Sequence, residues 1–197
     1  MANVYLSGDE GWAQLPSVER CRALAGHLLE IDGIDSIALR GEAPDSAELW
    51  THRGVGRVGF TSSGLFQEGT AFATAFEQAT PETALELSAE EENPDAAFAL
   101  ASLFASERAG DLLVSAQVGV DLRTKSEWPE HHASHGALHR EHTVVPVLSS
   151  AALPERLLRT LDLFAVTLEL AGISLDEYPE SDTARLASGD WRPEVWR

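Results

Sequence analysis

The sequence predicts an α/β fold, with a mixed sheet, flanking helices and a small antiparallel hairpin. Short runs with strand composition alternate with longer stretches of helical periodicity, which is the pattern of α/β proteins. Two extended runs also stand close together around a glycine-containing turn, as in a hairpin. The chain of 197 residues is 44% hydrophobic, so we expect a single globular domain over 1–197 with a real core.

The first forty residues predict a strand, a helix and a second strand. Residues 2–6 have strand composition and end at turn residues. A helix is expected from Ser17 to Ile31, because apolar residues recur there at helical spacing, Ser17 follows a proline as N-cap, and Gly33 stands just past the end. A strand over 34–40 follows.

A small hairpin is expected next, from extended runs at 48–52 and 57–60 joined by a turn at 53–56. Gly54 and Gly56 could suggest a nucleotide loop. The third glycine and the following helix of such a loop are missing, so the hairpin turn is favoured.

Residues 61–95 have no clear pattern, and the acidic stretch 90–95 is expected to be an exposed loop or a helix N-terminus. A helix is predicted over 96–109 and ends at Gly110, and 111–116 has the composition of a buried strand.

The last third of the chain predicts one more strand and one more helix. Residues 144–148 are apolar, and Pro146 places them at a sheet edge or a strand end. Residues 154–173 predict a turn and then a helix capped by Gly172. The acidic, tryptophan-containing tail 174–197 is expected to lie over the body of the domain.

Composition excludes several classes of function. The chain has 32 acidic and 14 basic residues, and a net charge of −18 repels nucleic acid and anionic membranes. Such acidity suits a cell with a salty interior or a high-GC genome. No run of about 18 apolar residues and no secretion signal is present, so we expect a cytoplasmic protein. Cys21 is the only cysteine, which gives no support for a disulfide, thiol catalysis or a cysteine-based zinc site.

Five of the seven histidines fall within residues 131–142, which makes a metal site the first hypothesis. His135 is the strongest candidate ligand, because it lies between two predicted strands and Gly136 allows a tight turn beside it. The neighbouring histidines are either accessory ligands or solvated loop residues, and nothing in their spacing decides: His131, His132, His139 and His142. His27 and His52 are expected at the surface or partly buried.

Residues 110–116, 131–140 and 159–173 together resemble the C-terminal part of the alkaline phosphatase superfamily, in its type I phosphodiesterase/nucleotide pyrophosphatase group. The paired elements are His135-Gly136-Ala137-Leu138 and an Arg159-Thr160-x-Asp162 helix that ends in Leu170-x-Gly172-Ile173. The resemblance implies an alkaline-phosphatase-like C-terminal half, in which residues 2–6 match the strand after the family's Asp-His metal motif. It further implies two divalent metals, commonly zinc, beside a Thr or Ser nucleophile, with His135 as the last metal ligand along the chain.

The family's nucleophile, early Asp ligand, Asp-x-x-x-His pair and Asp-His pair have no counterpart here. Asp9, Asp32 and Asp35 are turn or helix-end residues that solvation explains. The resemblance therefore implies a truncated or split phosphoester hydrolase segment that has no catalytic residue of its own and is inactive alone. Zinc would bind only where residues outside the chain complete the site.

The expected partner is a chain carrying the N-terminal half of the enzyme, or a further copy of this chain. Two other interpretations stay open. The first is a non-catalytic metal-binding or protein-interaction module on the same scaffold, and the second is a self-sufficient zinc site made by the histidine cluster alone.

Overall fold

The computed structural model describes residues 1–8, 11–12, 14–43, 46–106, 108–122 and 136–187. Two compact units are distinguished, Met1–Val145 and Pro146–Arg197, and each is described by itself. The first contains all the described strands. No helix among the described residues is both long and apolar enough to cross a membrane.

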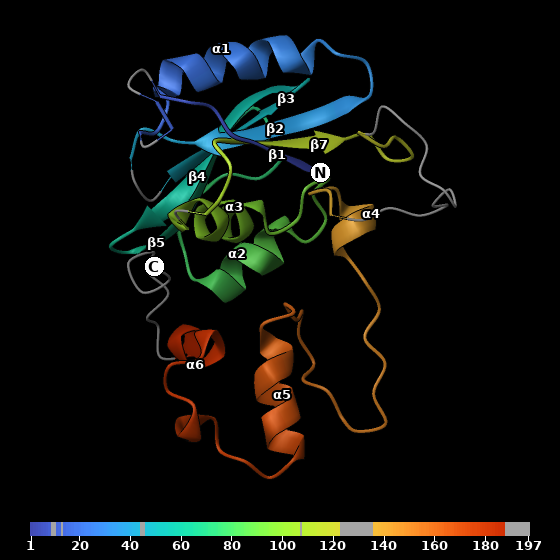
Figure 1. Ribbon diagram of the computed structural model, residues 1–197. Helices are drawn as coiled ribbons and strands as arrows, with labels where there is room; N and C mark the ends of the chain where they lie inside the picture. Colours follow the sequence, from blue (N-terminus) through green and yellow to red (C-terminus); the bar gives the residue numbers. More distant parts are fainter. Residues whose placement is uncertain (9–10, 13, 44–45, 107, 123–135, 188–197) are drawn as a thin grey trace, which may run out of the picture. The chain divides into compact units, whose positions relative to one another are not determined.

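A seven-stranded sheet in the order β1-β7-β2-β3-β4-β5-β6 forms the first unit (Figure 1). Its strands are β1 (Ala2–Val4), β2 (Ile34–Arg40), β3 (Ser46–Thr51), β4 (Gly54–Thr61), β5 (Gly64–Gly69), β6 (Phe76–Ala79) and β7 (Leu112–Ala116). The predicted strands over 2–6, 34–40 and 111–116 are therefore confirmed, the second with identical bounds. Strands β5 and β6 come from the stretch that had no clear pattern.

Every described pair of neighbouring strands is antiparallel, so the prediction of a mixed sheet is wrong. Short connections join each strand from β2 to β6 to the next one, so each of these strands runs antiparallel to its neighbour. Helix α1 (Val18–Leu29) connects β1 to β2, and such a crossover usually makes two parallel neighbours. Here β1 and β2 do run the same way, but β7 lies between them and opposes both.

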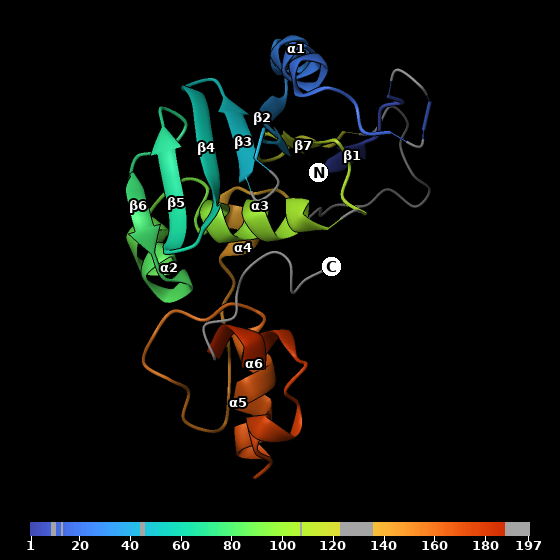
Figure 2. The ribbon, with the colours of Figure 1, turned by 90° about the vertical axis from the view of Figure 1, so that its left-hand side faces the viewer.

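Helices cover both faces of this sheet (Figures 1 and 2). Helix α1 packs on one face, where Leu39 belongs to a buried cluster with Cys21 and Ala25 of that helix. The adjacent Arg40 points to the opposite face, as successive strand residues do, and donates a hydrogen bond to the Phe104 carbonyl at the end of α3 (Ala96–Ala105). Helix α2 (Pro81–Ser88) packs beside α3.

The local sequence explains where helices α1 and α2 begin. The Ser17 side chain accepts a hydrogen bond from the Arg20 backbone N–H at 3.3 Å, and that of Thr80 accepts one from Thr83 N–H at 3.2 Å, ahead of Pro81 in the first turn of α2. The predicted helices over 17–31 and 96–109 are thus confirmed, although α3 ends four residues early, at Ala105.

The predicted hairpin is also confirmed, with a shorter turn. Thr51 pairs with Gly54, so the turn consists of His52 and Arg53 alone. Gly54 and Gly56 lie inside β4, where a Cβ atom would collide with the side chains of Thr70 and Phe72 respectively. These glycines allow close packing, which accounts for them without a nucleotide loop.

The second unit contains α5 (Asp162–Leu170), a 3₁₀ turn η1 (Leu175–Glu177) and α6 (Asp182–Ala187). The Asp162 carboxylate accepts a hydrogen bond from the Arg159 backbone N–H at 2.7 Å, which folds the Arg-Thr-x-Asp element into the helix start. Gly172 has a φ of +71°, and Ile173 N–H donates to the Leu168 carbonyl at 2.9 Å. Gly172 therefore ends α5, as predicted.

Two predictions for the rest of the chain have different outcomes. Residues 144–148 form no strand, because no strand of the described residues pairs with them. The tail 174–197 begins with η1 and α6, and its last ten residues lie outside the described part, so its expected packing over the body stays a prediction.

Candidate functional site: the anchored end of the histidine segment

The proposed ligand His135 lies outside the described residues, as do His131 and His132. The description resumes at Gly136, directly after His135. Gly136 has a φ of +91°, and no atom of the described residues lies within 4 Å of the position that a Cβ would occupy. The glycine is therefore favoured by the backbone conformation alone.

The residues that follow Gly136 are held in place. Ala137 and Leu138 are 7% and 8% exposed. Helix α4 (Arg140–Thr143) begins immediately afterwards, and His139 caps it by accepting a hydrogen bond from the Glu141 backbone N–H through Nδ1 at 3.3 Å. The chain just after His135 is thus fixed by burial and by a capped helical turn.

Helix α4 is attached to the acidic loop between α2 and α3. The Arg140 backbone N–H donates to the Glu92 carbonyl at 2.8 Å, and its guanidinium reaches the Glu90 carbonyl at 3.2 Å. The Glu92 carboxylate lies 3.3 Å from the Arg53 guanidinium and 4.0 Å from Nε2 of His139. The exposed ion pairs contribute little individually, so the backbone hydrogen bond is the firmest of these attachments.

A buried carboxylate also holds the loop between α2 and α3 in place. Glu91 is 5% exposed and accepts hydrogen bonds from the Thr74 backbone N–H at 2.8 Å and from Gln67 Nε2 at 3.1 Å. Asn93 is buried too, at 3% exposure. Of the two alternatives predicted for 90–95, an exposed loop is therefore wrong for Glu91 and Asn93, because neutral donors satisfy the buried carboxylate, whereas a helix N-terminus is confirmed at Asp95, the N-cap of α3.

The remaining described histidines do not assemble a metal site. His142 Nδ1 is buried without a hydrogen-bond partner among the described residues. His27 is exposed on α1, and His52 is an exposed turn residue whose Nε2–H donates to the Ile34 carbonyl at 2.9 Å. In the described ranges, no group of three or more His, Cys, Asp or Glu side chains could hold a metal ion.

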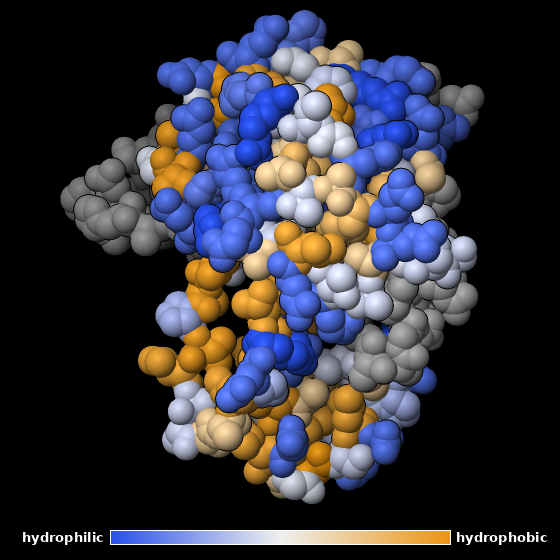
Figure 3. All heavy atoms as spheres, turned by 180° about the vertical axis from the view of Figure 1, so that it is seen from behind, coloured by the Kyte–Doolittle hydropathy of each residue, from blue (hydrophilic) through white to orange (hydrophobic). Residues whose placement is uncertain are grey.

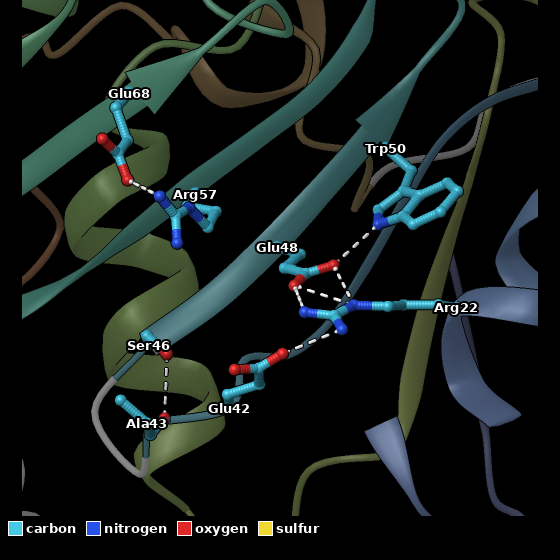
Figure 4. Close-up of polar contacts among 8 residues, drawn as sticks. All are labelled: Arg22, Glu42, Ala43, Ser46, Glu48, Trp50, Arg57 and Glu68. Carbon is cyan, nitrogen blue, oxygen red and sulfur yellow. Dashed lines mark hydrogen bonds and ion pairs between the residues drawn. The ribbon is translucent and has the colours of Figure 1, made fainter. Parts of the chain in front are cut away.

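A polar cluster that the sequence analysis missed lies between α1 and β3 (Figure 4). Arg22 from α1 donates to both carboxylate oxygens of Glu48, with its Nε 3.1 Å from each, and Trp50 Nε1 donates to the same carboxylate at 3.0 Å. Glu42 lies 2.9 Å from the other side of the Arg22 guanidinium. The i, i+2 spacing of Glu48 and Trp50 on a strand was the available signal that they share a face.

The pKa shifts in this cluster indicate a structural role. Burial by itself would raise the pKa of Glu48, but hydrogen bonds from Arg22 and Trp50 outweigh it and hold that pKa below its ordinary value. The hydrogen bond to Glu48, and then the one to Glu42, raise the pKa of Arg22. Glu48 therefore stays ionised and paired at neutral pH, which suits a clamp between α1 and the sheet.

Cys21 is buried on α1, and burial followed by the negative charge of Asp111 raises the pKa of its thiol. Because the thiolate is the reactive form, we expect the native protein to react very slowly with a disulfide reagent such as DTNB at pH 7. The same reagent should titrate one thiol at once in denaturant. Fast modification of the native protein would contradict the buried placement.

No family model, curated protein or solved structure matches this chain.

Proposed function

We propose that this chain supplies one metal ligand, His135, to a metal-dependent phosphoester hydrolase site of the phosphodiesterase/nucleotide pyrophosphatase type. The nucleophile and the remaining ligands would come from polypeptide outside this sequence. The proposal rests on the resemblance carried by residues 110–116, 131–140 and 159–173. Each of these stretches has a defined local structure where it is described: a fully buried β7, a left-handed Gly136 followed by an anchored Arg140, and an α5 that ends at Gly172.

The observation that carries the proposal is the backbone around Gly136. Its left-handed conformation is followed by buried Ala137 and Leu138 and by the hydrogen bond from Arg140 N–H to the Glu92 carbonyl. A ligand holds a metal effectively when its own position is fixed in advance by neighbouring contacts. Such an anchor directly after His135 supports a role for that imidazole in binding.

One imidazole does not make such a site. Zinc sites in enzymes use three protein ligands and keep one open position, and two-metal sites need several Asp and His ligands. The described residues offer no further ligand set beside Gly136: the Glu90 and Glu92 carboxylates are engaged by Arg140 and Arg53. The residues present thus fit a donor of one ligand and do not fit a complete centre.

The isolated chain is therefore expected to show no turnover of bis-p-nitrophenyl phosphate above background when zinc is added. The matched control is the same assay with His135→Ala, which should give the same background. Robust zinc-dependent turnover by the parent chain that His135→Ala abolishes would contradict the proposal that catalytic parts lie outside this sequence.

A protein-interaction module is the second candidate function. The observation that favours it is an exposed apolar run over 144–148, in which the exposed fractions of Val144, Val145, Val147 and Leu148 are 58%, 66%, 42% and 93%. Soluble proteins seldom leave such a contiguous run open to water unless it binds something. The two candidates are compatible, because a contributor to a shared site needs a surface for association.

A further inference from the structure

A buried carboxylate of the first unit is held by neutral groups alone within the described part of the chain. Glu91 is 5% exposed and accepts its two hydrogen bonds from the Thr74 backbone N–H and the Gln67 side-chain amide. Neutral donors satisfy the lone pairs of a carboxylate but leave its charge uncompensated. An ionised carboxylate is strongly disfavoured in a protein interior unless it pairs with an opposite charge or coordinates a metal ion.

No cationic side chain among the described residues forms an ion pair with Glu91. Arg53 and Arg140 both reach the loop between α2 and α3, but they contact other carboxylates. The Arg53 guanidinium lies 3.3 Å from Glu92, and that of Arg140 lies 3.4 Å from Glu90. Glu90 and Glu92 are exposed, whereas Glu91 between them is buried. The charge of Glu91 therefore remains to be balanced by a group other than these arginines.

Three buried side-chain oxygens of this region have lone pairs that no described residue uses. Both hydrogen bonds to Glu91 end on Oε1, so its Oε2 accepts none. Gln67 is fully buried and its Oε1 has no hydrogen-bond partner, and the same holds for Oδ1 of Asn93, which is 3% exposed. A buried water molecule would donate to the amide oxygens but would leave the carboxylate charge uncompensated. A cation answers both requirements.

The Gln67 amide is fixed beside the carboxylate before any ligand arrives. Its Nε2 donates to the Thr74 carbonyl at 2.9 Å and to Glu91 Oε1 at 3.1 Å. Oε1 belongs to the same amide group as this nitrogen, so an ion next to the Glu91 carboxylate lies within reach of it. Ligands whose positions are already held by neighbouring contacts bind an ion more effectively.

We propose that Glu91 and Gln67 bind one alkali cation, sodium or potassium, where the loop between α2 and α3 meets β5. Asn93 is the further candidate ligand in this loop. Hard cations prefer oxygen ligands, including carboxylates and the carbonyl oxygens of Asn and Gln. A single carboxylate balances a single positive charge, whereas high-affinity calcium sites gather several acidic ligands.

The charge of the whole chain favours the arrival of a cation. The net charge is −18, and such a surface raises the local concentration of positive ions. Figure 3 shows hydrophilic residues over most of the upper part of one face, which belongs to the first unit. A bound ion would also stabilise the loop whose Glu92 carbonyl accepts the hydrogen bond from Arg140 N–H, and so the attachment of α4.

Thermal unfolding of the full chain in NaCl, KCl and choline chloride at equal ionic strength tests the proposal. Screening is the same in the three salts, but choline is a bulky quaternary ammonium that oxygen ligands cannot enclose. The melting temperature should be about 3 °C higher in NaCl or KCl than in choline chloride, the shift for an ion at about five times its dissociation constant. The salt with the larger shift identifies the ion. Equal melting temperatures in all three salts would overturn the proposal.

Two glutamate variants test whether the salt effect belongs to this carboxylate. Glu91→Gln keeps the size of the side chain and an acceptor oxygen but removes the charge, so it should abolish the difference between the salts. Glu90→Gln changes the adjacent glutamate, whose side chain is 91% exposed, and should keep the difference. Circular dichroism shows whether both variants fold, and the salt series on the parent chain tests the proposal even if Glu91→Gln does not. A difference that persists in folded Glu91→Gln would place the ion elsewhere and overturn the assignment.

Discussion

Replacement of Arg22 by alanine is expected to lower the free energy of unfolding by about 3 kcal/mol. The reason is the Glu48 carboxylate, which is 4% exposed and would be left in the protein interior with Trp50 as its remaining hydrogen-bond donor among the labelled contacts of Figure 4. Breaking one side of a buried ion pair typically costs about 3–5 kcal/mol, and the low end applies here because the Arg22 side chain is 31% exposed. Urea denaturation followed by circular dichroism measures the change.

Two control variants separate charge burial from simple loss of contacts. Joint replacement of Arg22 by Met and Glu48 by Leu removes both charges and should recover most of the lost stability. Glu42→Ala removes a partner that is 72% exposed and should change the unfolding free energy by less than about 1 kcal/mol. Equal losses in Arg22→Ala and the joint variant would show that the buried carboxylate is not the cause.

The Arg22–Glu48 ion pair also makes the free energy of unfolding depend on pH. Because the folded protein holds the pKa of Glu48 below its ordinary value, the unfolded chain binds this proton more readily. The stabilisation is present above the unfolded pKa of about 4.3 and is lost as the pH falls through the lower folded value. Between about pH 5 and 3, wild-type protein should therefore lose more stability than Glu48→Gln. Parallel curves for the two proteins would contradict this.

Gly69→Ala is the second replacement with a large expected effect, a loss of about 3 kcal/mol or more. Gly69 has a φ of +95°, which an alanine adopts only with strain, and a Cβ there would also collide with the Val55 carbonyl and lie 2.9 Å from the Gly56 Cα. Both obstacles are backbone atoms of the neighbouring strand β4, which cannot turn aside as a side chain can. The midpoint of urea unfolding reports the loss.

Gly119→Ala is the matched control for Gly69→Ala. Gly119 has a similar φ of +84°, but none of the atoms in the described part of the chain lies within 4 Å of its Cβ position. Its replacement should cost only the conformational strain, about 1 kcal/mol. The difference between the two variants isolates the contact between β5 and β4, and similar losses would show that this contact is not tight in solution.

Local patterns in the sequence predicted individual elements well. Strand β2 has the predicted bounds, and α1 begins after its predicted cap, Ser17, because caps and apolar periodicity act over a few residues. The order of strands was not predicted. The insertion of β7 between β1 and β2 joins residues that are far apart in the sequence, and alternation within a strand says nothing about such a partner.

The role of His135 stays a prediction, because that residue lies outside the described part of the chain. Gly136 has a positive φ, which the glycine permits, whereas the anchoring of α4 to the loop at 90–92 was not foreseen. Runs of glutamate are normally read as solvated, and only the fold reveals that Glu91 has Gln67 and Thr74 as donors. Residues 144–148 have strand composition, but a strand needs a neighbour, and the described residues provide none.

Zinc titration calorimetry tests the proposed role of His135 most directly. If the chain supplies one ligand to a centre completed from elsewhere, the parent protein alone should bind zinc no more than weakly, and His135→Ala should reduce the heat of binding. His27→Ala, which removes an exposed imidazole on α1, should leave it unchanged. Binding that survives in His135→Ala with equal affinity, or tight binding by the chain alone as in a complete four-ligand site, would contradict the account.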